Sequence, residues 1–256
     1  LYDVNINAVV TIPYELYEFF SLWGKEDEKE ITADIEEDIS FLMEQGFLTE
    51  KKKISSIKHY ETDTLKDLYM YNMGNVILQV TQNCNLRCEY CVYSGSYINR
   101  VHTNKRMSFE TAVKTIDFLA AHSLNCNEVS IGFYGGEPLL EIELIKKAVS
   151  YAKEVFGEKK VNFNMTTNAT LLNMDIADFL VQNDFNITIS LDGPRNIHNK
   201  NRIFANSNKG TFDLIMENIA LIREKYPFFD KKISFNAVID LKQNVSCTCL
   251  LYTSDA

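Results

Sequence analysis

The sequence predicts an α/β fold, in which a parallel sheet with helical crossovers follows a smaller α+β segment. From Asn75 onward, short apolar runs rich in Val, Ile and Phe alternate with amphipathic segments, which is typical of a doubly wound or barrel-like parallel sheet. Residues 1–70 lack this alternation. The chain has 256 residues, 46% of them hydrophobic, which suits one large domain or a large domain with a small one.

The first 70 residues predict a small, winged-helix-like α+β domain. Its expected elements are a strand over residues 1–10, a helix starting at Pro13, a second helix from its cap Thr32 to the stop signal Gly46, and a short hairpin over residues 47–60. A polar connection is expected near residues 60–70.

The larger domain is expected over residues 75–246. Its five strands are predicted at 75–80, 128–134, 161–167, 185–191 and 231–239, and its four helices at 109–122, 141–156, 172–183 and 211–226. Because the strands are rich in Val, Ile and Phe, we expect them to be buried on both faces. Parallel strands joined by helices imply right-handed crossovers.

The C-terminal residues break the pattern. The eight residues "CLLYTSDA" match the translation of a transposon-type sequencing adapter, TGT CTC TTA TAC ACA TCT GAC GCT. We therefore expect residues 247–256 to be a non-native tail and the natural chain to continue differently.

Charge and hydropathy exclude two classes of partner. The net charge of -9, from 26 basic and 35 acidic residues, provides no basic surface for nucleic acid. No run approaches the roughly 18 apolar residues of a membrane span, and the N-terminus lacks a signal-peptide pattern. A cytoplasmic protein is expected, and in that reducing compartment clustered cysteines more often bind metals or act in catalysis than form disulfides.

Three cysteines, Cys84, Cys88 and Cys91, form a C-x3-C-x2-C motif at the end of the first predicted parallel strand. Thiolates suit zinc or iron–sulfur clusters. A [4Fe–4S] cluster held by three cysteines keeps one iron open for a substrate or cofactor. The alternatives are three incidental buried thiols, or a zinc site with a remote fourth ligand.

This spacing, with the aromatic Tyr90 before the last cysteine, resembles the cluster motif of the radical S-adenosylmethionine (SAM) superfamily. The resemblance implies that the amino and carboxylate groups of SAM bind the open iron. Electron transfer into the sulfonium would then release methionine and a 5'-deoxyadenosyl radical, which abstracts a hydrogen atom from the substrate.

Three further motifs support the resemblance, each at the end of a later strand. In "FYGGEPLL", the residues Gly135, Gly136 and Glu137 resemble the motif that binds the methionyl amino group; the alternative is an ordinary Gly-Gly turn. In "TTNATLL", Asn168 is either a ligand residue or a helix cap.

The last of these motifs is "SLDGPRNIHNKNR". There, Ser190 and Arg202 match positions that contact the ribose and the methionyl carboxylate, and Asp192 is interpreted as a turn residue. Because barrel active sites lie at the C-terminal ends of strands, one cofactor could lie across all four motifs. The family has a six-stranded partial (β/α) barrel, so a five-stranded chain is expected to be C-terminally truncated.

The motifs are most similar to the branch of the family that modifies peptides and proteins. The first hypothesis is a ribosomal-peptide maturase that forms a thioether crosslink in a Cys-rich precursor, whose leader the N-terminal domain would bind; that domain could equally be a packing extension. The second is an anaerobic sulfatase-maturating enzyme that forms formylglycine, and the third an inactive cluster protein that only binds peptide. An electron donor such as flavodoxin or ferredoxin is implied.

The remaining cysteines and histidines receive no catalytic role. Cys126 is expected to be a half-buried thiol far from the site, and His198 a polar loop residue. No catalytic acid or base is assigned.

Overall fold

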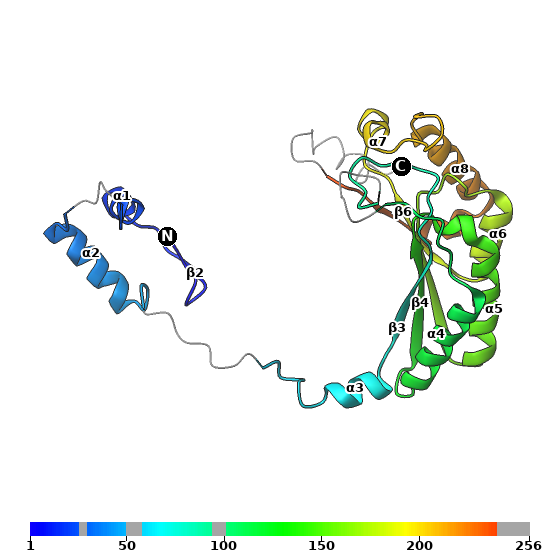
Figure 1. The fold of residues 1–256 in the computed structure, drawn as a ribbon, viewed down its shortest axis with the longest axis horizontal. Helices are drawn as coiled ribbons and strands as arrows, with labels where there is room; N and C mark the ends of the chain where they lie inside the picture. The colour runs from blue at the N-terminus through cyan, green and yellow to red at the C-terminus, as the bar shows by residue number, and fades with distance from the viewer. Residues whose placement is uncertain (26–29, 50–57, 94–100, 240–256) are drawn as a thin grey trace. The chain divides into compact units, whose positions relative to one another are not determined.

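The computed structural model describes residues 1–25, 30–49, 58–93 and 101–239. It divides into two compact units, residues 1–62 and 63–256 (Figure 1). The proposed non-native tail and most of the expected hairpin at 47–60 lie outside the described residues. Among the described helices, none has the length and apolar character needed to cross a membrane.

The first unit begins with a tight hairpin. Strands β1 (Tyr2–Asp3) and β2 (Ala8–Val9) pair antiparallel, so the prediction of one strand over residues 1–10 is wrong. The chain turns because the Asp3 carboxylate accepts a hydrogen bond from the Asn5 backbone N–H at 2.8 Å, and Asn7 adopts a left-handed φ of 53°.

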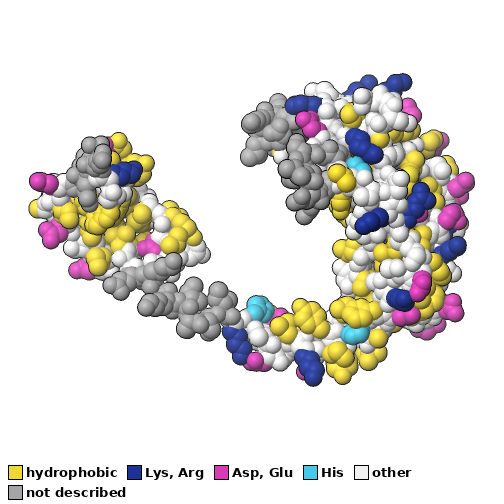
Figure 2. All heavy atoms as spheres, in the orientation of Figure 1, with side chains coloured by type: hydrophobic (Ala, Val, Ile, Leu, Met, Phe, Trp, Pro, Cys, Tyr) yellow, Lys and Arg dark blue, Asp and Glu magenta, His cyan; other side chains and the backbone are white. Residues whose placement is uncertain are grey.

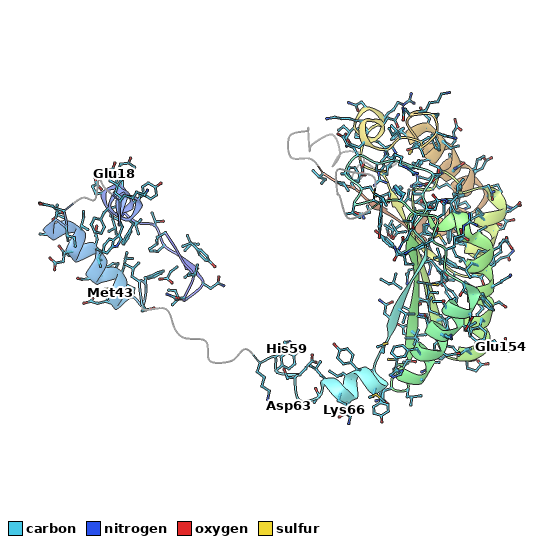
Figure 3. The ribbon with its side chains drawn as sticks, in the orientation of Figure 1. Glu18, Met43, His59, Asp63, Lys66 and Glu154 are labelled. Atoms are coloured by element: carbon cyan, nitrogen blue, oxygen red, sulfur yellow. The ribbon has the colours of Figure 1, made fainter. Side chains whose placement is uncertain are left out.

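Two helices complete this unit, close to the predicted positions. They are α1 (Tyr14–Leu22) and α2 (Ala33–Glu44), and Thr32 caps α2 by accepting from the Ile35 N–H at 3.4 Å. A small core forms between them from Leu16, Phe19, Ile35 and Leu42. Met43, labelled with Glu18 in Figure 3, is on the exposed side of α2.

The second unit begins at Asp63 and opens with α3 (Leu65–Tyr71), on which Lys66 lies (Figure 3). The sequence predicted a polar connection here, with the domain boundary near residue 70. The structure instead has a helix that contacts α4 (Phe109–His122), so this segment belongs to the larger unit.

The larger unit contains a five-stranded sheet in which consecutive strands are neighbours and every pair is parallel. The strands are β3 (Asn75–Thr81), β4 (Glu128–Gly135), β5 (Lys160–Thr167), β6 (Asn186–Ser190) and β7 (Ile233–Asn236). All five strands predicted from the sequence are confirmed. This topology is that of a partial barrel.

The crossover helices cover one face of this sheet (Figure 1). They are α4, α5 (Ile142–Phe156), α6 (Met174–Gln182) and α8 (Phe212–Lys225), which confirms the four predicted helices; short 3-10 turns lie at Pro138–Glu141 and Pro227–Lys232. The sequence did not predict α7 (Arg195–Asn201), which follows β6.

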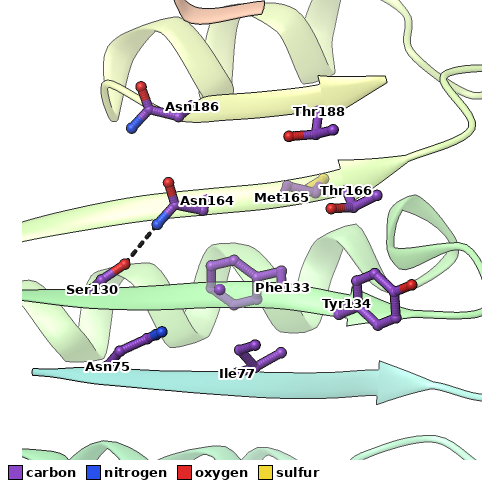
Figure 4. Close-up of a pocket in the computed structure, with 11 residues that line it drawn as sticks. Asn75, Ile77, Ser130, Phe133, Tyr134, Asn164, Met165, Thr166, Asn186 and Thr188 are labelled. Carbon is purple, nitrogen blue, oxygen red and sulfur yellow. Dashed lines mark hydrogen bonds between the residues drawn. The ribbon is translucent and has the colours of Figure 1, made fainter. Parts of the chain in front are cut away.

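The two faces of the sheet differ, which corrects the prediction that its strands are buried on both sides. Buried side chains such as Ile131, Phe133 and Phe163 belong to the core formed with the helices. Most alternate positions on the strands are polar, with Ile77 and Tyr134 among the exceptions. Figure 4 shows them lining a cavity of about 260 Å³, with the Asn164 amide donating to the Ser130 hydroxyl at 2.6 Å. The strands alternate with period two, as expected for a barrel wall whose interior is polar.

Candidate cluster and cofactor site

A pocket of about 360 Å³ lies where the strands of the large sheet end. It brings together side chains and backbone from β4, β5, β6 and the loop after β3. Nine of the ten residues predicted from the motifs line it: Cys84, Cys88, Tyr90, Cys91, Gly135, Gly136, Asn168, Ser190 and Arg202. The tenth, Glu137, is not among the lining residues.

The loop that carries the cysteines is held against a later segment of the chain. Its backbone donates from Arg87 to the Ile203 carbonyl at 2.9 Å and from Glu89 to the Asn201 carbonyl at 3.2 Å. The Ala205 N–H in turn donates to the Asn85 carbonyl at 2.9 Å. The loop and residues 201–205 therefore form one backbone unit, although more than a hundred positions separate them in the sequence.

The cysteine thiols are partly or fully withdrawn from solvent. Burial raises the pKa of Cys84 to about 12 and that of Cys88 to about 11. The Cys84 sulfur accepts from the Leu86 backbone N–H at 3.4 Å and from the Asn168 side-chain amide at 3.9 Å. Positive iron would favour the thiolate forms that burial disfavours, and these donors suit a sulfur that carries negative charge.

The cysteine arrangement fits a cluster by its donor chemistry. Three thiolates can each bind a different iron atom of a [4Fe–4S] cluster and leave the fourth iron open. Cys84, Cys88 and Cys91 are the residues that would hold it.

The two glycines after β4 allow close backbone contact within the protein. A Cβ on Gly135 would lie 2.1 Å from the Thr81 carbonyl oxygen, and one on Gly136 would lie 2.0 Å from that of Asn83. The Gly136 N–H donates to the Thr81 carbonyl at 2.9 Å. Ligand access was the reason that the sequence suggested for these glycines. The structure adds a second reason, because they fasten the end of β4 to the start of the cysteine loop.

Glu137 lies behind the pocket wall and has no exposed surface. Its carboxylate accepts hydrogen bonds from the Leu139 N–H at 3.0 Å, the Thr167 hydroxyl at 2.6 Å and the Asn168 N–H at 2.7 Å. Burial raises its pKa despite these donors. In this structure Glu137 joins the ends of β4 and β5, which is a bracing contact that the sequence did not predict.

Asn168 is part of an amide network beside the cluster loop. Its side-chain amide donates to Asn85 Oδ1 at 2.9 Å, and its Oδ1 accepts from the Thr170 hydroxyl at 2.7 Å and the Thr170 N–H at 3.0 Å. The two interpretations made from the sequence were a ligand residue and a helix cap. The cap of α6 is Asn173, which accepts from the Ile176 N–H at 2.9 Å, so Asn168 is not that cap.

Asp192 was interpreted as a turn residue, and this is wrong. Its carboxylate is buried and accepts four hydrogen bonds: from Arg202 Nε at 2.9 Å, Arg202 Nη2 at 3.2 Å, the Tyr90 hydroxyl at 2.5 Å and the Val238 N–H at 3.1 Å. The Arg202 guanidinium also lies 5.5 Å from the centre of the Tyr90 ring. Two of the three guanidinium nitrogens therefore bind Asp192, and within the described part of the chain no hydrogen bond reaches Nη1.

Sequence reasoning missed other residues of this pocket. His102 and Tyr93 line it, with the His102 N–H donating to the Tyr93 carbonyl at 3.1 Å; burial is the main reason that the pKa of His102 is lowered. Both lie in irregular chain, where no periodic signal exists. His198, expected in a polar loop, is fully buried on α7. Cys126 is half-buried and does not line the pocket.

Comparison with known proteins agrees with this geometry. The profile of the Radical SAM superfamily matches residues 78–245. The cysteine-type anaerobic sulfatase-maturating enzyme of Clostridium novyi is 33% identical over 180 residues, which cover 69% of this chain and 46% of the relative. The radical SAM cyclopropyl synthase TigE of Paramaledivibacter caminithermalis is 24% identical over 234 residues, covering 83% of this chain and 48% of the relative.

A solved structure of native anSMEcpe with bound AdoMet is also similar. Its TM-score is 0.53 with 28% sequence identity, over 64% of this chain and 42% of that one. A further structure holds both AdoMet and the Kp18Cys peptide, with a TM-score of 0.53. The chain spans about half the length of the curated relatives that it matches.

The chain belongs to the radical SAM superfamily, because the family profile covers well over half of it. Membership brings a [4Fe–4S] cluster and S-adenosylmethionine as cofactors. The relatives named as anaerobic sulfatase-maturating enzymes support the branch of the superfamily that modifies peptides and proteins.

Proposed function

We propose that this chain is the cofactor-binding core of an enzyme that modifies a peptide or protein by radical chemistry. The observation that carries the proposal is the convergence of nine sequence-predicted residues, from four separate motifs, on one pocket. The relatives named as sulfatase-maturating enzymes and the peptide-bound solved structure support the same class of substrate.

When bound, the cluster and SAM would supply a one-electron reduction that generates a radical able to take a hydrogen atom from the substrate. The protein's part is to bind and orient. Cys84, Cys88 and Cys91 would hold the cluster, and a small protein such as flavodoxin or ferredoxin would donate the electron. The backbone of Gly135 and Gly136 would bind the methionyl amino group.

Two other residues are assigned to the remaining parts of SAM. Ser190, half-buried at the end of β6, is proposed to bind the ribose, and Arg202 Nη1 the methionyl carboxylate. Tyr90 lines the same pocket and donates its hydroxyl to Asp192. Asp192 binds Nε and Nη2 of Arg202, so the proposal assigns the remaining nitrogen, Nη1, to the cofactor.

Two products are proposed for the modified residue of the substrate. A thioether crosslink from a cysteine sulfur to a carbon, in a Cys-rich precursor, is the first candidate. Formylglycine formation in a sulfatase is the second, and the 33% identity to a cysteine-type anaerobic sulfatase-maturating enzyme favours it. A cysteine-containing peptide suits both candidates, and a serine is the alternative starting residue for formylglycine.

The N-terminal unit is proposed to bind the substrate's leader. Apolar side chains on its hairpin and first helix are open to solvent: Tyr2 is 55% exposed, Val9 79%, Tyr14 66% and Tyr17 58% (Figure 2). An extended peptide could add as a strand to the short sheet and cover them.

The experiment is to reconstitute the chain anaerobically with iron, sulfide, SAM and dithionite, and to add either a Cys-rich precursor peptide or a sulfatase peptide with its target cysteine. Mass spectrometry separates loss of two hydrogens alone, the thioether outcome, from loss of two hydrogens together with replacement of sulfur by oxygen, the formylglycine outcome. Failure to form 5'-deoxyadenosine with either peptide would favour the inactive cluster protein instead.

A further inference from the structure

His198 connects the two residues of the buried Asp192–Arg202 pair. It lies on α7 between them in the sequence, and neither it nor Thr211 beside it has exposed surface. An imidazole that is fully buried needs partners for both ring nitrogens, because an unpaired polar atom in the interior is costly.

Both ring nitrogens of His198 have hydrogen-bond partners, and these partners identify which nitrogen accepts and which donates. The Asp192 backbone N–H points to Nδ1 at 3.2 Å, so Nδ1 is the acceptor. Nε2 therefore carries the proton and donates to the Thr211 hydroxyl at 2.9 Å. That hydroxyl then donates to the Arg202 carbonyl at 3.2 Å. The chain of bonds runs from the backbone of Asp192 to that of Arg202.

We propose that His198, acting with Thr211, is a positioning residue for SAM: it fixes the backbone on both sides of the Asp192–Arg202 pair so that Arg202 Nη1 faces the pocket. This inference rests on the proposed function, because it assumes that Arg202 contacts the cofactor. It concerns a residue that neither touches the pocket nor was assigned a role by its motif.

The segment that His198 and Thr211 hold in place also contacts the cysteine loop. The segment from Asn201 to Ala205 begins at the end of α7, and it exchanges backbone hydrogen bonds with the loop from Asn85 to Glu89. The Arg202 N–H itself donates to the His198 carbonyl at 2.9 Å. Fixing the end of α7 therefore sets the position of the arginine, while the cysteine loop keeps its own backbone hydrogen bonds to this segment.

An apolar residue could not replace His198, because it would make none of these hydrogen bonds. Phenylalanine would fill a similar volume but would leave the Asp192 N–H and the Thr211 hydroxyl without these partners. Asparagine, whose Oδ1 can take the place of Nδ1, keeps the contact to Asp192 and loses the one to Thr211. Thr211→Val removes the hydroxyl and keeps the shape of the side chain.

The test is a double-mutant cycle on SAM affinity, measured by isothermal titration of the reconstituted protein. We expect His198→Asn and Thr211→Val each to weaken SAM binding by roughly tenfold while iron content stays at the parental level. In an Arg202→Lys background, which removes the planar fork but keeps the charge, the same changes should weaken it less than twofold. Thr115→Val, which removes an exposed hydroxyl bonded to the Thr111 carbonyl on α4, is the control and should change nothing.

Equal losses in both backgrounds, or no loss in the parent background, would overturn the inference, because His198 would then act independently of Arg202 or not at all. If His198→Asn does not fold, Thr211→Val alone carries the same comparison. A parent protein that binds the cluster but no SAM refutes the proposed function itself, and this result is distinct from a defect confined to the variants.

Discussion

Asp192→Asn should destabilise the larger unit far more than the loss of an ordinary ion pair. The carboxylate is 1% exposed and Arg202 is 8% exposed, so the substitution leaves a buried guanidinium without its counter-charge. Removing one partner of a buried pair costs about 3–5 kcal/mol, a large part of the roughly 5–15 kcal/mol that stabilises a typical domain. Asparagine also cannot accept all four of the hydrogen bonds that reach this side chain.

Asp213→Asn is the matched control. Asp213 pairs with Arg195, but the side chains of this pair are 53% and 67% exposed, so its loss should cost about 0–1 kcal/mol. Urea unfolding of the cofactor-free protein, followed by far-UV circular dichroism, gives both values. Tryptophan fluorescence is unsuitable, because the single tryptophan, Trp23, lies in the other unit. Equal losses for the two variants would refute the claim that Asp192 neutralises a buried charge.

Three further outcomes follow from the geometry. Gly136→Ala should reduce iron incorporation severalfold, because the added Cβ would lie 2.0 Å from the Asn83 carbonyl oxygen. Gly132→Ala is the control and should incorporate iron normally, because its Cβ would lie 3.4 Å from the nearest atom, Cγ1 of Ile77. Burial, aided by the nearby arginine, lowers the pKa of His198 to about 4 from 6.5. The contribution of neutral His198 to stability is therefore complete above pH 6.5 and is lost as the pH falls toward 4. Over that range, the urea midpoint of His198→Asn should fall less steeply than that of the parent. Thr32→Ala removes a helix cap and should cost the first unit about 1 kcal/mol, measured by the fluorescence of Trp23; an unchanged midpoint would contradict the cap.

The strands and long helices of the large unit could be predicted from the sequence because each carries its own periodic pattern. The helix α7, "RNIHNKN", has no apolar stripe, so nothing in its local sequence distinguishes it from a polar loop. Its buried histidine becomes recognisable only when Thr211 and Asp192 are brought next to it by the fold. The sequence also predicted burial on both faces of the sheet, because the apolar residues of each strand are the stronger signal. The Asn, Ser and Thr residues that alternate with them form the polar face.

The candidate site divides in a similar way. Motif spacing identified the pocket residues, since ligand contacts cluster at strand ends. The residues that support them could not be read from spacing: Glu137 braces two strands and Asp192 holds an arginine ten positions away. An acid followed ten positions later by an arginine within one motif is the sequence signal for the Asp192–Arg202 pair. Supporting contacts depend on tertiary geometry, which local patterns do not encode.

The central claim is that Cys84, Cys88 and Cys91 hold a cluster that leaves one iron for SAM, and electron paramagnetic resonance of the reduced protein tests it most directly. The parent and Cys126→Ala, which changes a half-buried thiol outside the pocket, should both contain about four irons per chain and change their spectrum when SAM is added. Cys88→Ala should lose the iron and the response to SAM. A Cys88→Ala protein with the parental iron content and the parental spectral change would contradict the claim.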